Sequence, residues 1–214
     1  MTKAIHGIAF AAVMIMKHLM LILLISLFTG TAFGQYNWKL EKDKDGIKVY
    51  SSDVPKSDFK ATKVDCTITG NYSKLVSILT NVSQFDNWIY HSKTSRLLKK
   101  YSPYDIIYHS ETEMPWPFSN RDIVIHLRVN TDSLPKFLTI NSTSEPDLVP
   151  RSGKVRVVEY SASWKVTMPT AQSIHIDYLM QVDPGGSMPG WVANIFVGKG
   201  PFETFNNLAK KLIE

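Results

Sequence analysis

The stretch DPGGSMPGWVANIFVGKGPFETFNNLAKKL, residues 183–212, joins a turn to an amphipathic pattern. Its opening DPGG has the residues that reverse chain direction. Apolar side chains then recur at helical spacing, at Trp191, Ile195, Phe202, Phe205, Ala209 and Leu212. This spacing predicts a C-terminal helix over residues 189–213 that buries one face. Gly198, Gly200 and Pro201 interrupt the pattern and predict a bend or break there.

Upstream of this helix, apolar and polar residues alternate with the period of half-buried β-strands. The segments are 46–52, 59–68, 104–111, 121–129, 137–144, 155–166 and 174–182. Tyr104 and Val158 belong to the apolar faces of their segments, and residues 71–81 fit a short helix. Polar side chains fill the opposite faces, which is typical of an antiparallel sheet with one wet side. The predicted fold class is therefore α+β, a curved antiparallel sheet whose apolar face is covered by the long C-terminal helix.

The N-terminal segment predicts export from the cytoplasm. Residues 19–28, LMLILLISLF, follow a basic position and precede small residues, which is the layout of a secretory signal peptide. We expect residues 1–34 to be removed, with Met16 as an alternative start, and residues 35–214 to form one secreted or periplasmic domain. The alternative is an uncleaved N-terminal anchor, because residues 8–28 together approach membrane-spanning length.

The composition is that of an ordinary globular protein, with 44% hydrophobic and 20% charged residues, which excludes a disordered chain. The net charge is +5 but no run of five like charges is present, so nucleic-acid binding is not predicted. We interpret Arg96, Lys99 and Lys100 as a solvated strand end, with weak attraction to an anionic membrane as the alternative. Cys66 is the only cysteine, which excludes an intrachain disulfide, and we predict that it is buried.

No catalytic or metal-binding pattern stands out. The histidines are scattered, and no nucleophile elbow, phosphate loop or second cysteine is present. His109, Glu111 and Glu113 alternate on one strand face, which a charged outer face explains as well as a metal or acid–base site does. A cyclase- or hydrolase-type enzyme remains the alternative function. Its candidate acid–base groups are His109, His126, Tyr108, Tyr160 and Tyr178.

Several stretches, in this order and spacing, resemble the START (StAR-related lipid-transfer) domain family. They are DGIKVYSSD (45–53), WPFSNRDIV (116–124), SWKVTMP (163–169) and the segment 183–212. The matching positions are Pro117, Arg121, Asp122, Asp183, Pro184, Gly185, Gly186, Pro189, Trp191 and Asn194. The resemblance covers nearly all of residues 35–214. It implies a helix-grip fold around an apolar tunnel and the carriage of one lipid molecule without chemistry. Leu127 stands where sterol-binding relatives have a basic residue, so sterol specificity is not carried over.

The resemblance and the strand faces together give a set of expected site residues. We expect the tunnel to be lined by Tyr108, Ile123, Ile125, Leu127, Tyr160, Trp164, Ile176, Tyr178, Trp191, Ile195, Phe202 and Phe205. The expected lid hinge comprises Asp183, Pro184, Gly185, Gly186, Gly200 and Pro201. Arg121 and Asp122 are expected to form an ion pair that fixes the loop after Pro117, with a contact to the ligand head group as the alternative.

We expect as partners a lipid or another apolar small molecule and, transiently, a membrane surface. No cofactor, metal or nucleic acid is expected, and we expect a monomer. The sequence leaves open which lipid is bound and whether the role is transport, storage or sensing.

Overall fold

The computed structural model describes residues 36–214, with the side chains of residues 191, 195 and 196 outside the described part. The signal-peptide prediction for residues 1–34 lies outside the described residues. The strands are β1 (Lys39–Lys44), β2 (Ile47–Ser52), β3 (Ala61–Thr69), β4 (Ser92–Ser102), β5 (Asp105–Thr112), β6 (Arg121–Asn130), β7 (Leu138–Ser144), β8 (Val155–Arg156), β9 (Tyr160–Thr170) and β10 (Ser173–Val182). The helices are α2 (Tyr72–Thr80), the 3₁₀ helix η1 (Val82–Asn87) and α3 (Gly190–Ile213).

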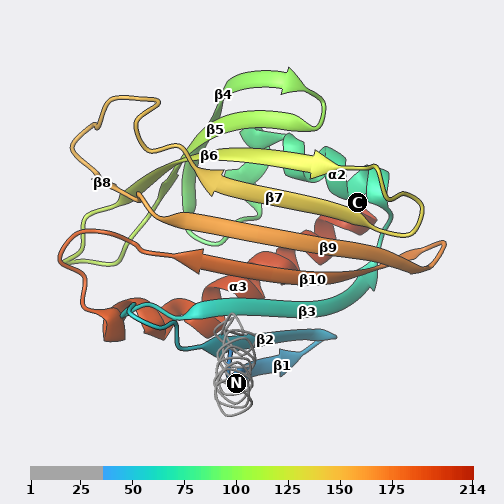
Figure 1. Cartoon of the computed structure of the whole chain (residues 1–214), viewed down its shortest axis with the longest axis horizontal. Coiled ribbons are helices and arrows are strands. Elements are labelled where there is room, and N and C mark those ends of the chain that lie inside the picture. Colours follow the sequence, from blue (N-terminus) through green and yellow to red (C-terminus); the bar gives the residue numbers. More distant parts are fainter. Residues whose placement is uncertain (1–35) are drawn as a thin grey trace, which may run out of the picture. The chain divides into compact units, whose positions relative to one another are not determined.

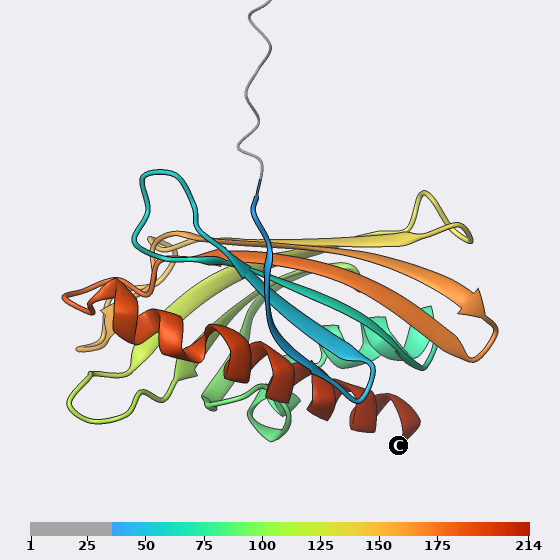
Figure 2. The same cartoon turned by 90° about the horizontal axis from the view of Figure 1, so that it is seen from below.

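All ten strands form one sheet, in the order β1-β2-β3-β10-β9-β7-β6-β5-β4, with β8 pairing beside β6 (Figure 1). Neighbours along this path pair antiparallel, and β8 pairs parallel with the start of β6. Figure 2 shows the sheet curving around α3, which lies along its concave side. The predicted α+β class and helix-grip arrangement are confirmed. Within residues 36–214, no helix combines the length and apolar character needed to cross a membrane.

The core forms where the apolar faces of the strands meet the buried stripe of α3. Phe202, Phe205, Leu208 and Leu212 on the helix are 0–7% exposed. Buried side chains of β3, β5, β6, β9 and β10 belong to the same apolar cluster. The alternation in the sequence therefore predicted correctly which face of each strand is buried, because the side-chain period of a strand is two.

The two α-helices begin for different local reasons. Asn71 caps α2 by accepting a hydrogen bond from the Lys74 N–H at 2.9 Å, and Leu75 and Leu79 anchor the helix in the core. α3 follows Pro189, whose extended backbone ends the preceding turn. The helix continues through Pro201 without interruption, so of the predicted bend or break the break is absent. A proline removes only one backbone donor, and Phe202 and Phe205 directly after it are buried in the core.

One predicted strand is divided. Residues 155–166 were expected to be continuous, but β8 ends at Arg156 and β9 starts at Tyr160. β8 pairs with β6, whereas β9 pairs with β7 and β10, so the chain must cross between sheet positions. Val158 lies in this crossing and is 45% exposed, contrary to its predicted place on the apolar face. Tyr104 is also 45% exposed, because it lies in the turn before β5.

The structure contains three elements that the sequence pattern did not predict. β1 and β4 are the two edges of the sheet, and both are rich in charged residues that solvate an edge. η1 is too short to show helical periodicity. Phe85 within η1 is nevertheless buried and contacts Tyr108, with ring centroids 5.2 Å apart.

Candidate functional site

A cavity of about 370 Å³ lies between the concave face of the sheet and α3, and we call it the inner cavity. Side chains from β5, β6, β7, β9 and β10 form one side, and residues of α2, η1 and α3 form the other. The lining is mainly apolar and aromatic, with eight hydroxyl groups, four of them from tyrosine, and one guanidinium. A concave, apolar site with few polar groups is typical of small-molecule binding sites.

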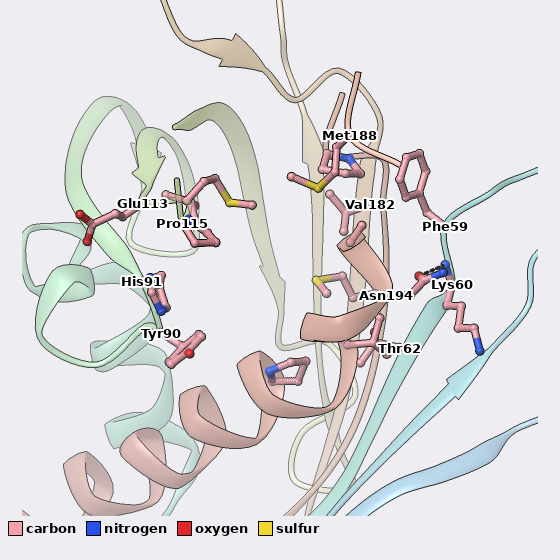
Figure 3. Close-up of a pocket in the computed structure, with 17 residues that line it drawn as sticks. Phe59, Lys60, Thr62, Tyr90, His91, Glu113, Pro115, Val182, Met188 and Asn194 are labelled. Carbon is pink, nitrogen blue, oxygen red and sulfur yellow. Dashed lines mark hydrogen bonds between the residues drawn. The ribbon is translucent and has the colours of Figure 1, made fainter. Parts of the chain in front are cut away.

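A second cavity of about 200 Å³, the outer cavity, adjoins the inner one and shares wall residues with it, including Thr112, Met180 and Pro201. Figure 3 shows its two sides, with Tyr90, His91, Glu113 and Pro115 facing Phe59, Lys60, Thr62, Val182, Met188 and Asn194. His91, Glu113 and Pro115 are exposed to solvent, so this cavity lies between the inner cavity and the surface.

Three aromatic rings join the sheet to α3 at the wall of the inner cavity. Trp164 stacks on Phe205 with ring centroids 5.1 Å apart, and Tyr178 lies 4.8 Å from Trp164 and 5.2 Å from Phe205. Such rings contribute large apolar surfaces with defined relative geometry. The hydroxyl groups of Ser142 and Tyr160 lie 3.3 Å apart in the same wall.

The N-terminal half of α3 is tied to the rest of the fold by few polar contacts. Asn194 accepts a hydrogen bond from the Lys60 N–H and donates one to the Asp58 carbonyl, both at 3.3 Å. Further along the helix, Thr204 accepts a hydrogen bond from the Tyr90 N–H at 3.2 Å. The backbone also approaches closely at Gly190, where a Cβ would lie 2.6 Å from the Asp58 carbonyl oxygen.

Arg121 and Asp122 do not pair with each other, which corrects the expected ion pair. Successive residues of a strand point to opposite faces. Arg121 therefore lines the inner cavity, while Asp122 lies on the outer side and binds Arg156 with N–O distances of 3.0 and 2.7 Å. His109 donates to the same carboxylate at 2.9 Å. This network fastens β8 to β6.

Most residues expected to line the tunnel lie in the inner cavity wall. They are Tyr108, Ile123, Ile125, Leu127, Tyr160, Trp164, Tyr178 and Phe205. Ile176 is fully buried among core residues away from the wall. Phe202 also lies outside the wall, because its ring faces β1, where Lys42 Nζ is 3.6 Å from its centroid. The side chains of Trp191 and Ile195 lie outside the described residues.

The residues expected to form the hinge lie at both ends of the N-terminal half of α3. Asp183 accepts a hydrogen bond from the Gly185 N–H at 2.7 Å, and Gly185 and Gly186 have positive φ angles of 68° and 69°. Glycine adopts this left-handed conformation without strain. Pro184, Gly200 and Pro201 also line the inner cavity.

Some wall residues were absent from the predicted set. Ser110 and Thr112 share the strand face of Tyr108, and Met180 and Val182 share that of Tyr178, so strand alternation indicates all four. Phe85, Trp88 and Tyr90 also line the inner cavity. They come from η1 and the segment after it, where no periodic signal exists.

The candidate acid–base groups fall into two sets. Burial raises the pKa of Tyr108, Tyr160 and Tyr178 above the usual tyrosine value, so these phenols stay protonated at neutral pH. His109 and His126 lie on the outer face of the sheet, where they hydrogen-bond to Asp122 and Asp105. Neither histidine lines the inner or the outer cavity.

Within residues 36–214, one group of side chains has the spacing of a metal site. The ligand atoms of Asp65, His175 and Asp177 lie within 4.8 Å of one another on the outer face of β3 and β10. The pairing of Asp65 with Asp177 across the two strands brings them together. His175 already hydrogen-bonds to Thr67 at 3.0 Å, and the group alone assigns no metal.

Comparison with known proteins gives consistent matches. The family profile described as START domain matches residues 25–213. An uncharacterized protein of Pseudomonas aeruginosa is 34% identical over 182 residues, covering 84% of this chain and 88% of that protein. Human phosphatidylcholine transfer protein is 27% identical over 168 residues, covering 74% of this chain and 75% of that protein.

The structural comparison agrees with the sequence comparison. A crystal structure of a STAR-related lipid transfer protein from Xanthomonas axonopodis, fragment 25–204, superimposes with a TM-score of 0.76 at 31% identity. The match covers 83% of this chain and 99% of that fragment. The sheet order, the position of α3 and the family profile over nearly the whole described chain lead to one conclusion: this protein belongs to the START domain family.

Proposed function

We propose that this protein binds one molecule of a lipid or similar apolar ligand in the inner cavity, and that the N-terminal half of α3 closes over it as a lid. The observation that carries the proposal is the apolar, aromatic-lined cavity of about 370 Å³ under the helix. The lipid-transfer proteins among its relatives support it. Binding or carriage without chemistry is favoured because the tyrosines of the wall are neutral donors and both candidate histidines lie outside it.

The cavity volume suggests a single hydrocarbon chain. At ~30 Å³ for each water-sized group, 370 Å³ holds about twelve groups, and the outer cavity adds room for several more. Each buried methylene contributes about 0.8 kcal/mol, so a chain of about sixteen carbons gains roughly 13 kcal/mol by leaving water. Unassisted release into water would therefore be slow, and exchange requires the site to open at a membrane.

The first test is native mass spectrometry of the purified protein, followed by organic extraction and identification of any released lipid. We expect one ligand per chain. A protein that purifies empty and takes up no fluorescent fatty acid, phospholipid or sterol would contradict ligand binding. It would also favour the alternative of an enzyme acting on an aromatic substrate.

The lid is tested by cross-linking α3 to the loop that it contacts. Paired substitutions Lys60→Cys and Asn194→Cys replace residues joined by a hydrogen bond. Oxidation should trap bound ligand and stop its transfer between vesicles, and reduction should restore transfer. Equal transfer rates for the oxidised and reduced protein would overturn the lid. The native Cys66 is buried and does not compete for the new thiols.

We further propose that the protein is exported and that residues 1–34 are removed, as the N-terminal sequence predicts. Intact mass and N-terminal sequencing of the protein from cell fractions test this. A mature chain starting at Gln35 outside the cytoplasm is expected, and a full-length chain in the membrane fraction would support the uncleaved anchor instead.

A further inference from the structure

Arg121 is a buried cation in the wall of the inner cavity. The residue is 5% exposed, begins β6 and donates to Pro184, which lines both cavities. Its guanidinium donates to the carbonyl oxygens of Ser119 at 2.5 Å and of Pro184 and Gly185 at 3.3 Å. These bonds hold the side chain in place beside the turn that precedes α3.

The charge of Arg121 is not balanced by a carboxylate. Among residues 36–214, no Asp or Glu oxygen lies within 4.0 Å of the guanidinium nitrogens of Arg121. This includes the carboxylate of Glu113, which lines the outer cavity. Arg156, in contrast, is fully buried against Asp122. Burial lowers the pKa of Arg121, and no neighbouring charge opposes the shift. Carbonyl groups accept hydrogen bonds from three of its N–H groups but do not neutralise its charge, and buried arginine is rarely unpaired.

Donor capacity remains for one more partner. A guanidinium has five N–H groups, and three of those of Arg121 donate to carbonyl oxygens. Thr112 lies directly opposite Arg121 in the register of β5 and β6, so their side chains share a face. Thr112 lines both cavities and therefore lies where they join.

We propose that Arg121, with Thr112 beside it, binds an anionic group of the ligand, a carboxylate or a phosphate, at the junction of the two cavities. This inference rests on the proposed function and names the ligand class of the same site. The hydrocarbon chain then extends into the inner cavity toward Trp164, Tyr178 and Phe205. A guanidinium fork suits both anions, because it donates two parallel hydrogen bonds to a pair of oxygens.

The test compares three ligands with the same saturated chain, a fatty acid, an alkyl phosphate and a fatty alcohol, by direct binding to the full protein. At least one anion should bind about ten- to a hundredfold more tightly than the alcohol, as expected for hydrogen bonds to a charged group. Which anion binds more tightly distinguishes a carboxylate ligand from a phosphate ligand.

Three variants assign the effect to this residue. Arg121→Gln should bring the ratio of anion affinity to alcohol affinity close to one, because it removes the charged hydrogen bonds to the anion. The ratio is the readout, since the variant also loses the bonds to Ser119, Pro184 and Gly185, which affects both ligands alike. Arg128→Gln is the matched control, since Arg128 lies in the same strand and contacts His126 on the opposite face. Arg128→Gln should keep the preference for the anion over the alcohol. Arg121→Lys retains the positive charge and should keep part of the preference for the anion. Thermal unfolding verifies that each variant is folded.

The outcomes are distinguishable. Equal affinity of the unmodified protein for all three ligands overturns the anion site and leaves the proposed function intact. This comparison does not depend on any variant folding. Failure to bind any of the three overturns the proposed function and the anion site together. An anion preference that survives Arg121→Gln overturns the assignment to Arg121.

Discussion

Asp122 and Arg156 are separated by 34 positions in the chain, and both side chains are fully shielded from solvent. Arg156 also donates to the carbonyl oxygens of Pro146, Val149 and Pro150, so it gathers the loop before β8 around one guanidinium. Burial alone would raise the pKa of Asp122, but hydrogen bonds from Arg156 and His109 outweigh it and lower the pKa below the usual aspartate value.

We predict that Asp122→Asn strongly destabilises the fold. It leaves Arg156 buried without a counter-charge, and breaking a buried pair typically costs about 3–5 kcal/mol. Urea unfolding at neutral pH measures the loss. Asp53→Asn is the control, because Asp53 is 92% exposed in a surface pair with Lys60 and should change stability little. Equal, small effects of the two substitutions would contradict a structural role for Asp122.

The same ion pair makes a prediction about pH. A carboxyl group whose pKa is lower in the folded state stabilises the fold fully above its unfolded-state pKa of about 3.9. This contribution disappears as the pH falls through the folded-state pKa. The difference in unfolding free energy between the unmodified protein and Asp122→Asn should therefore shrink below about pH 4. A constant difference down to the acid limit would rule out titration of this group.

Cys66 gives a third prediction at this scale. Burial raises the pKa of its thiol to about 12, and the nearby Asp65 and Asp177 act in the same direction. Since the thiolate is the reactive form, we expect no labelling by a maleimide in the folded protein and complete labelling in urea. Rapid labelling of the native protein at neutral pH would show that β3 opens readily.

At the scale of elements, the two halves of α3 have different surroundings. The half after Pro201 places Phe205, Leu208 and Leu212 in the core. The half before it lines the outer cavity, where Asn194 makes two hydrogen bonds to the loop between β2 and β3. One helix thus combines a fixed end with an end held by contacts that can be broken cheaply.

We predict that Asn194→Ala speeds ligand release about fivefold, because it removes hydrogen bonds worth about 1 kcal/mol. Transfer of a fluorescent lipid to acceptor vesicles, followed by stopped flow, measures the rate. Asn206→Ala is the matched control, since Asn206 lies in the same helix without a side-chain hydrogen bond among the described residues. Unchanged release from Asn194→Ala would mean that these bonds do not limit opening.

At the scale of the whole described unit, the sheet and the C-terminal half of α3 form a continuous core, and the outer cavity lies between this core and the N-terminal half of α3. Local stability follows the density of buried contacts. The segment around the outer cavity should therefore open without unfolding the sheet, which is what ligand exchange requires.

Hydrogen exchange tests this division. We predict that backbone amides in residues 190–200 exchange faster than those in residues 202–213, and that ligand binding slows exchange in the first group. Amides of β9 and β10, at the centre of the sheet, should exchange most slowly. Uniform protection along α3 would contradict a lid formed by half of the helix.

The sequence alone predicted much of this arrangement. Apolar spacing located α3, and strand alternation oriented β5, β6 and β10, because a side chain's face depends only on its local period. Strand alternation placed Leu127 inward and Arg128 outward, and the family resemblance supplied the helix-grip arrangement. The signal peptide, the hinge and the bound lipid remain predictions.

The tertiary structure decided what depends on partners distant in the chain. Only the folded structure shows that Asp122 binds Arg156 and that Arg121 faces the cavity without a carboxylate. Only the strand pairing shows that the chain crosses between sheet positions at Val158. Edge strands β1 and β4 carry no apolar alternation, since an edge has little to bury. Local periodicity fixes which way a side chain points, but the pairing of strands determines what it meets.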